Sequence, residues 1–278
     1  MKKELSLGYS PCPNDTFIFY ALVMGKITGS DIVVKEVLED VETLNRMATE
    51  GVLDITKLSY HAYGHVRDEY CLLRAGGALG RGCGPLIVSN GKREIESLRG
   101  KRIAVPGRFT TAFLLLQLFD PVLGENVVFM PFNEIMDAVS KGSCDAGVII
   151  HEGRFTFGLY GLDEVLDLGE WWEQYTGLML PLGAIAARRS LGPELINAVE
   201  GSIRSSIRYA FDHSEEAMPY IKEHSQEMED EVIKKHIGLY VNDLSLDIGE
   251  EGERAIMKIL GMAEERNIFE KKDVSIFI

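Results

Sequence analysis

The sequence contains few cysteines, and none is placed for a disulfide framework or a zinc site. The four cysteines lie far apart and form no C-x-x-C pair; they are Cys12, Cys71, Cys83 and Cys144. Free thiols in a reducing compartment explain this spacing better than disulfides or bound zinc do. We therefore expect neither a disulfide nor a metal.

A long hydrophobic run is also missing. No stretch reaches the roughly 18 unbroken apolar residues of a membrane-spanning helix. Residues 1–9 begin directly with a strand-like pattern, without the apolar run of a signal peptide or a lipid-anchor cysteine after one. The expectation is a cytoplasmic protein with no membrane insertion.

Basic residues are outnumbered. The chain has 29 basic and 43 acidic residues, and its net charge of −14 is spread along the sequence. Such a surface disfavours nucleic acid and anionic membranes as partners. The glycine-dense run 76–84 contains neither the P-loop pattern nor the dinucleotide-binding pattern. An anionic ligand would therefore have to be held by local groups.

The order of apolar segments predicts an α/β protein. Strand-like runs alternate with helical periodicity, which favours mainly parallel sheets flanked by helices. Hydrophobic residues make up 46% of the chain, enough for one large domain or two lobes. We expect strands at 5–9, 32–38, 54–56, 71–75, 102–105, 127–130, 146–150 and 181–187. We expect helices at 16–24, 41–50, 110–119 and 134–141, and an all-helical block from 193 to about 266.

Two local patterns bear on the organisation of the lobes. Gly-x-x-Asp-apolar occurs at 51–55 and again at 142–146, each time between a helix and a strand, which favours two similar lobes. The glycine-dense run 76–84 indicates a bend, a hinge or a close backbone approach, and a plain flexible loop is the alternative. For the late helices at 215–236, a solvated surface is the default expectation.

The ends of the predicted strands are the candidate ligand site. In open α/β sheets, ligands bind beyond the carboxyl ends of the strands. Ser59 would begin one helix there, and Thr110 and Thr111 another, so free N–H groups could hold a carboxylate. Lys57 adds a positive charge; simple helix capping is the alternative for the hydroxyl residues. The four places that this rule selects are 10–15, 56–59, 107–111 and 151–154.

His151 is the candidate general base. It directly follows the buried strand predicted at 146–150, and neutral imidazole is the commonest base near neutral pH. A structural histidine is the alternative. His61 and His65 have the i, i+4 spacing of metal ligands, but without a third ligand a chance pair on a surface helix is favoured. Cys12 has no recognisable base beside it, so we do not expect a nucleophile there.

Several motifs resemble the 1,4-dihydroxy-6-naphthoate synthase family, whose members act in the futalosine route to menaquinone. The similarity covers nearly the whole chain. It is carried by residues 10–17 (SPCPNDTF), 38–45 (LEDVETLN), 56–60 (TKLSY), 149–152 (IIHE), 76–82 (GGALGRG), 180–184 (LPLGA) and 245–254 (SLDIGEEGER).

The resemblance implies a fold, a reaction and a set of site residues. The fold is that of the type 2 periplasmic binding proteins, which we expect here as one lobe of 1–88 with 186–278 and another of 89–185. The implied reaction cleaves cyclic dehypoxanthinylfutalosine to 1,4-dihydroxy-6-naphthoate and dihydroxyacetone, without metal or organic cofactor. The family's base falls on His151, and its substrate-binding positions fall on Thr56, Lys57, Leu58, Thr110 and Thr111.

Three alternatives stay open. Chorismate dehydratase shares the fold and the pathway. A non-catalytic solute-binding protein would need export, for which the N-terminus offers no signal. A ligand-sensing domain of a regulator would need an attached DNA-binding segment, which is not recognisable. The oligomeric state also stays open, with a homodimer as one alternative.

Overall fold

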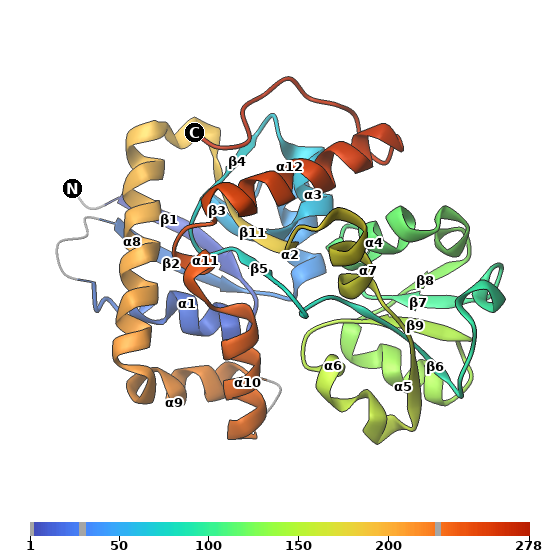
Figure 1. The fold of residues 1–278 in the computed structure, drawn as a ribbon. Coiled ribbons are helices and arrows are strands. Elements are labelled where there is room, and N and C mark those ends of the chain that lie inside the picture. Colours follow the sequence, from blue (N-terminus) through green and yellow to red (C-terminus); the bar gives the residue numbers. More distant parts are fainter. Residues whose placement is uncertain (1–2, 28–31, 226–228) are drawn as a thin grey trace.

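The computed structural model describes residues 3–27, 32–225 and 229–278, so Met1 and Lys2 of the N-terminal segment lie outside the described residues. Its strands form two separate sheets, each flanked by helices, and Figure 1 shows the two resulting lobes side by side. The expected α/β class is thus confirmed. No helix in the described ranges has the length and apolar character needed to cross a bilayer.

The first lobe is built on a six-stranded sheet, with order β2-β1-β3-β11-β4 and β5 paired to β11. Strands β1, β2 and β3 run parallel, whereas β11 is antiparallel to β3, β4 and β5. Its strands are β1 (Lys3–Tyr9), β2 (Ile32–Leu38), β3 (Ile55–Ser59), β4 (Tyr70–Leu72), β5 (Ala78–Gly80) and β11 (Leu180–Arg188). Its first helices are α1 (Pro13–Val23), α2 (Val41–Thr49) and α3 (Tyr60–Val66).

The second lobe is built on a five-stranded sheet with order β10-β6-β9-β7-β8. Strands β7, β8 and β9 run parallel, whereas β6 is antiparallel to both β9 and β10. The strands are β6 (Leu86–Asn90), β7 (Ile103–Val105), β8 (Val127–Phe129), β9 (Ala146–Ile149) and β10 (Leu162–Asp167). The helices are α4 (Thr111–Phe119), α5 (Ile135–Ser140), α6 (Gly153–Thr156) and α7 (Leu168–Thr176).

Both sheets are therefore mixed rather than mainly parallel. The chain passes from the first lobe to the second before β6 and returns at β11. Each of these two strands is antiparallel to its neighbours in the sheet that it joins. Apolar periodicity identifies a strand but does not record its direction. The expected division at 88 and 185 falls inside β6 and β11, and how the chain divides into domains stays a prediction.

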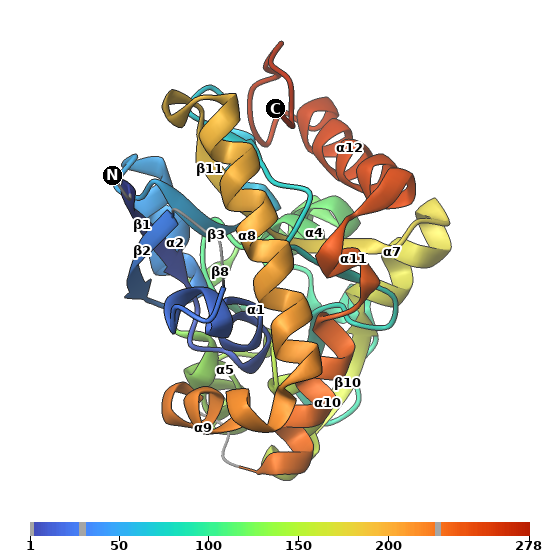
Figure 2. The same cartoon turned by 90° about the vertical axis from the view of Figure 1, so that its left-hand side faces the viewer.

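The C-terminal block is helical in its described part, as expected, while 226–228 lie outside the described residues. Its elements are α8 (Pro193–Asp212), α9 (Ser214–His224), α10 (Asp230–Tyr240), α11 (Asp243–Leu246) and α12 (Gly249–Glu265). Helix α8 places Ile196, Val199 and Ile203 on one buried face, the spacing of an amphipathic helix, and packs against α1. Figure 2 shows α8 as a long helix across this side of the first lobe.

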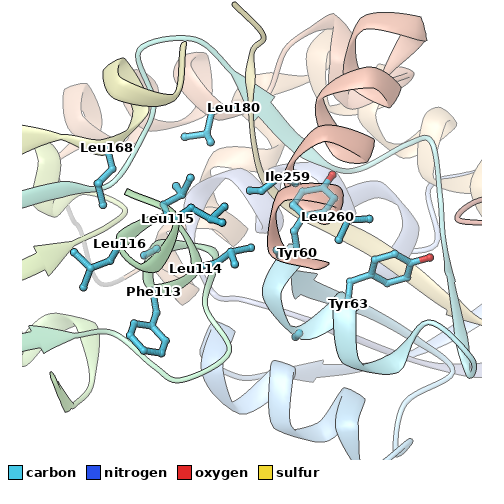
Figure 3. Packing of buried hydrophobic residues seen from close by; sticks show 14 of the residues in the cluster. Tyr60, Tyr63, Phe113, Leu114, Leu115, Leu116, Leu168, Leu180, Ile259 and Leu260 are labelled. Carbon is cyan, nitrogen blue, oxygen red and sulfur yellow. The ribbon is translucent and has the colours of Figure 1, made fainter. Parts of the chain in front are cut away.

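One hydrophobic core runs through the junction of the lobes. Helix α12 packs on α3 of the first lobe and on α4, which follows β7 of the second. Figure 3 shows Tyr60 of α3, Leu114 of α4 and Ile259 of α12 in this core. All three side chains are fully buried, so the last long helix stabilises the contact between the lobes.

The glycine-dense run includes a close backbone approach where the chain leaves the first lobe. A Cβ atom added to Gly84 would lie 2.3 Å from the Cα of Gly169, in the first turn of α7. The opposing atoms belong to backbone, which cannot move aside as a flexible side chain can. Only glycine fits at Gly84, so the close approach, one of the sequence alternatives, is what the structure contains there.

We expect Gly84→Ala to lower the free energy of unfolding by about 1–3 kcal/mol, because the added methyl group overpacks the crossing. Gly201→Ala on α8 is the matched control, since a Cβ there meets no atom within 4 Å. Replacing this glycine inside a helix by alanine should raise the free energy of unfolding by about 0.5–1 kcal/mol. Urea denaturation of both variants measures the difference, and equal effects would contradict the close approach.

Candidate functional site

A cavity lies between the two lobes, at the ends of their central strands. The space in it that is not filled by protein atoms is about 680 Å³, a volume that includes open solvent. Residues from all four strand ends selected from the sequence contribute to its lining. The first lobe supplies Ser10, Asn14, Asp15, Lys57, Ser59 and Tyr240, and the second supplies Pro85, Thr110, Thr111, Ala112, Ile150 and His151.

The first-lobe wall contains a buried ion pair. The Nζ of Lys57 lies 2.5 Å from Oδ1 of Asp15, and the two side chains are only 7% and 2% exposed. Asp15 also accepts hydrogen bonds from the Ser10 hydroxyl at 2.7 Å and from the Asn14 amide at 2.8 Å. The charge of Lys57 is therefore balanced within the protein, which the sequence analysis missed. A carboxylate at the start of α1, shortly after a predicted strand end, was the available signal.

His151 forms the facing wall. It lies in the turn after β9 with φ +55°, a left-handed backbone conformation that is uncommon outside glycine. Its ring contacts Phe132 edge-on with centroids 5.1 Å apart. Burial is the main cause that lowers the pKa of His151, while the charges of Glu152 and Asp15 act in the opposite direction. The imidazole is consequently neutral near pH 7 and can accept a proton.

Cys12 does have a base beside it, contrary to the sequence expectation. Its Sγ lies 3.8 Å from Nδ1 of His151, a contact between residues 139 positions apart that no local pattern reveals. Burial is the largest cause that raises the pKa of this thiol, and the nearby Glu152 charge adds to it. Cys12 is therefore a neutral thiol, and nucleophilic attack by it has no support.

Strand alternation divides the expected binding residues of β3. Lys57 and Ser59 line the cavity, whereas Thr56 and Leu58 do not, because successive side chains point to opposite faces. The Thr56 hydroxyl donates to the carbonyl of Lys57, and Leu58 belongs to the hydrophobic core. Of the six expected site residues, the cavity thus brings together Lys57, Thr110, Thr111 and His151.

The two helix starts differ from each other. Thr110 caps α4, with its hydroxyl accepting from the Phe113 N–H at 3.2 Å. Ser59 does not cap α3, and its hydroxyl accepts from the Asn45 amide instead. The first N–H of α3, that of Tyr60, donates to the hydroxyl of Thr111. The start of α4 thus borders the cavity, while the first N–H of α3 already donates a hydrogen bond within the protein.

Helix α10 contributes His236, the last residue of the range 215–236 for which a solvated surface was expected, and Tyr240 just beyond that range. His236 is only 1% exposed, so the surface expectation is wrong at this position. Its Nε2 lies 3.0 Å from Oδ1 of Asn14, and Tyr240 lines the cavity one turn further on. The spacing of Ile233, His236, Ile237 and Tyr240 is that of one helix face, which was the missed signal.

His61 and His65 pack against each other, but only His65 lies at the surface, which was expected for both. Their ring centroids are 5.5 Å apart, and His61 is only 4% exposed beside Phe109 and Phe113. Burial lowers the pKa of His61 to about 3. Within the described residues, no three histidine, cysteine or acidic side chains are grouped to hold a metal ion.

Relatives with assigned names match almost the entire chain. A family model described as menaquinone biosynthesis matches residues 5–265. The chain is 55% identical over 266 residues to a 1,4-dihydroxy-6-naphtoate synthase of Thermus thermophilus, covering 96% of each protein. It is 48% identical to a 1,4-dihydroxy-6-naphtoate synthase of Streptomyces coelicolor, covering 93% of this chain and 92% of the relative.

Solved structures confirm the expected fold. A crystal structure of a protein from Archaeoglobus fulgidus superposes with a TM-score of 0.89 at 39% identity, covering 96% of this chain and 98% of that one. The periplasmic aliphatic sulphonate binding protein of Escherichia coli superposes with a TM-score of 0.68 at 13% identity, covering 99% and 91%. The second likeness shows the periplasmic-binding-protein-like fold alone.

We expect Asp15→Asn to lower the free energy of unfolding by about 3–5 kcal/mol at neutral pH, because it leaves the buried ammonium of Lys57 without a carboxylate. Asp137→Asn is the control, since the Asp137–Lys141 pair is exposed and its loss should cost less than about 1 kcal/mol. Chemical denaturation compares them; a loss at Asp15 as small as that at Asp137 would argue against a stabilising buried pair.

Proposed function

Because this chain belongs to the menaquinone biosynthesis family, which matches nearly its whole length, we propose that it is a 1,4-dihydroxy-6-naphthoate synthase. Its proposed reaction cleaves cyclic dehypoxanthinylfutalosine to 1,4-dihydroxy-6-naphthoate and dihydroxyacetone. We propose His151 as the general base. Metal and organic cofactors are not part of this proposal.

One arrangement carries the proposal. A neutral imidazole on the second lobe and a buried lysine–aspartate pair on the first lobe line the same cavity. A base needs a substrate held in fixed orientation against it, and two walls from different lobes can supply this. Both curated relatives are named 1,4-dihydroxy-6-naphtoate synthase, which agrees with the proposed reaction. The chain matches each of them over more than nine-tenths of its length.

The substrate carries a carboxylate, which the cavity is suited to hold. The start of α4, at Thr110 and Thr111, offers a helix N-terminus with its partial positive charge. Lys57 lies in the same cavity and can donate further hydrogen bonds from its ammonium group. Thr56 and Leu58 stay in the proposed binding set on the family resemblance alone.

The proposed reaction is a fragmentation of the retro-aldol type. His151 removes a proton from a hydroxyl of the sugar-derived ring, the adjacent carbon–carbon bond breaks, and its electron pair passes into the ring that becomes aromatic. Aromatisation of the product supplies driving force, so the protein mainly has to position the base and exclude water. Closure of the two lobes around the substrate would accomplish both.

The direct test is incubation of the protein with cyclic dehypoxanthinylfutalosine, followed by the absorbance of the naphthoate product. We expect turnover by the wild type and a loss of at least about 10²-fold in kcat for His151→Asn, since a positioned base contributes on that scale. Near-wild-type kcat in a folded His151→Asn protein would refute the base assignment. Consumption of chorismate without naphthoate formation would favour the dehydratase instead.

The pH dependence of kcat/KM tests the environment of His151. The base acts only when unprotonated, so activity falls as pH decreases through its pKa. Because burial lowers that pKa, the acidic limb should lie below the value of about 6.5 for an exposed histidine. The limb is measured from initial rates after confirming that the protein stays folded at each pH. An acidic limb centred at or above about 6.5 would contradict a buried base.

A further inference from the structure

We propose that His236 is a positioning residue that acts on both walls of the cavity. Its ring stacks on the ring of His151, and its Nε2–H holds Asn14, which in turn holds the Asp15–Lys57 pair. The inference deepens the proposed function and rests on His151 as the base. No motif of the sequence analysis includes His236.

The position of His236 would ordinarily be occupied by an apolar residue. It lies on the face of α10 between Ile233 and Ile237, and α10 packs against α1 on the first lobe (Figure 1). Burying a polar ring costs free energy unless hydrogen bonds compensate for it. The only ring nitrogen of His236 with a hydrogen-bond partner among the described residues is Nε2, since Nδ1 is buried and unpaired.

The direction of the hydrogen bond to Asn14 follows from its neighbours. The carboxylate of Asp15 can only accept, so the Asn14 group beside it must be the amide NH₂, which donates at 2.8 Å. The other end of Asn14 is therefore the carbonyl oxygen, and Nε2 of His236 must carry the proton. Burial lowers the pKa of His236 to about 3, so the neutral ring has a single, fixed tautomer.

The hydrogen bonds form a continuous connection on the first lobe. His236 donates to Asn14, Asn14 donates to Oδ1 of Asp15, and the ammonium of Lys57 donates to the same oxygen. Because Asn14 is held at both ends, the carboxylate of Asp15 is fixed, and so is the Lys57 head that it binds. His236 thereby positions the cation proposed to hold the substrate carboxylate.

The second contact of His236 is with His151 of the second lobe. Its ring and that of His151 have centroids 6.2 Å apart and planes inclined by only 16°. His151 has a left-handed backbone conformation, which is strained for a residue with a side chain and must be maintained by its surroundings. A parallel ring from the opposite lobe restricts the rotation of the imidazole. His236 thus orients the proposed base without touching the substrate.

Two variants separate these contacts. His236→Phe keeps a stacked ring but removes the donor to Asn14, so KM should rise about tenfold, as for loss of one buried hydrogen bond, with a smaller change in kcat. His236→Gln places an amide donor near the position of Nε2 but removes the ring, so kcat should fall about 10²-fold, as for a misplaced base, with KM near that of the wild type. A purely structural role would not divide kcat and KM between the variants in this way.

His213→Gln is the matched control, because the side chain of His213 is exposed and, among the hydrogen bonds described, bonds only to the Tyr209 carbonyl of its own helix turn. Its kcat and KM should equal those of the wild type. Asn14→Leu supplies an independent route to the first effect: it should raise KM, and His236→Phe should add nothing further in that background, since the two residues act through one connection.

The proposal is overturned if folded His236→Phe and His236→Gln both retain wild-type kcat and KM, or if both change the two constants equally. Additive effects of His236→Phe and Asn14→Leu would overturn the connection through Asn14. Failure of the proposed function is recognised separately: there, His151→Asn itself keeps full turnover, or the wild type forms no naphthoate from the cyclic substrate. Circular dichroism and thermal unfolding of each variant establish that it is folded.

Discussion

The ion pair of Lys57 and Asp15 is the interaction on which the cavity depends. An ammonium group buried in protein is stable only with a partner, and a carboxylate in the first turn of α1 supplies it at 2.5 Å. The pair joins the start of α1, which follows β1, to β3, so these two neighbouring segments of the first lobe are fixed relative to each other. Ser10 and Asn14 add donors to the same carboxylate, which leaves a rigid, charged wall.

The opposite wall depends on the junction of the lobes. His151 reaches the first lobe only because both crossings of the chain and α12 hold the second lobe beside it. The close packing of Gly84 against Gly169 sets the position of the first crossing. The proposed base on one lobe and the cation on the other can then face one small molecule, and the distance between them is a property of the lobe arrangement rather than of either sheet.

Local patterns in the sequence are sufficient for the elements and for the strand ends, because apolar periodicity and helix starts depend on residues close in the chain. The ranges expected for β1, β2, α2 and α4, and the position of His151 after β9, illustrate this. Long-range contacts leave no such signal. Cys12 meets His151, and Asn14 meets His236, only through the folding of distant segments. Strand alternation, by contrast, was available from the sequence and would have separated Lys57 from Thr56 and Leu58.

The hydroxyl of Thr111 has a consequence for how the cavity can open. It accepts from the N–H of Tyr60 and donates to the carbonyl of Leu182, so one atom of the second lobe is bonded twice to the first. Hydrogen bonds tolerate a change of angle far better than a change of length. A rotation that keeps both bonds must therefore have its axis near Thr111. The rim at His151, away from that axis, would then travel furthest and would serve as the entrance for the substrate.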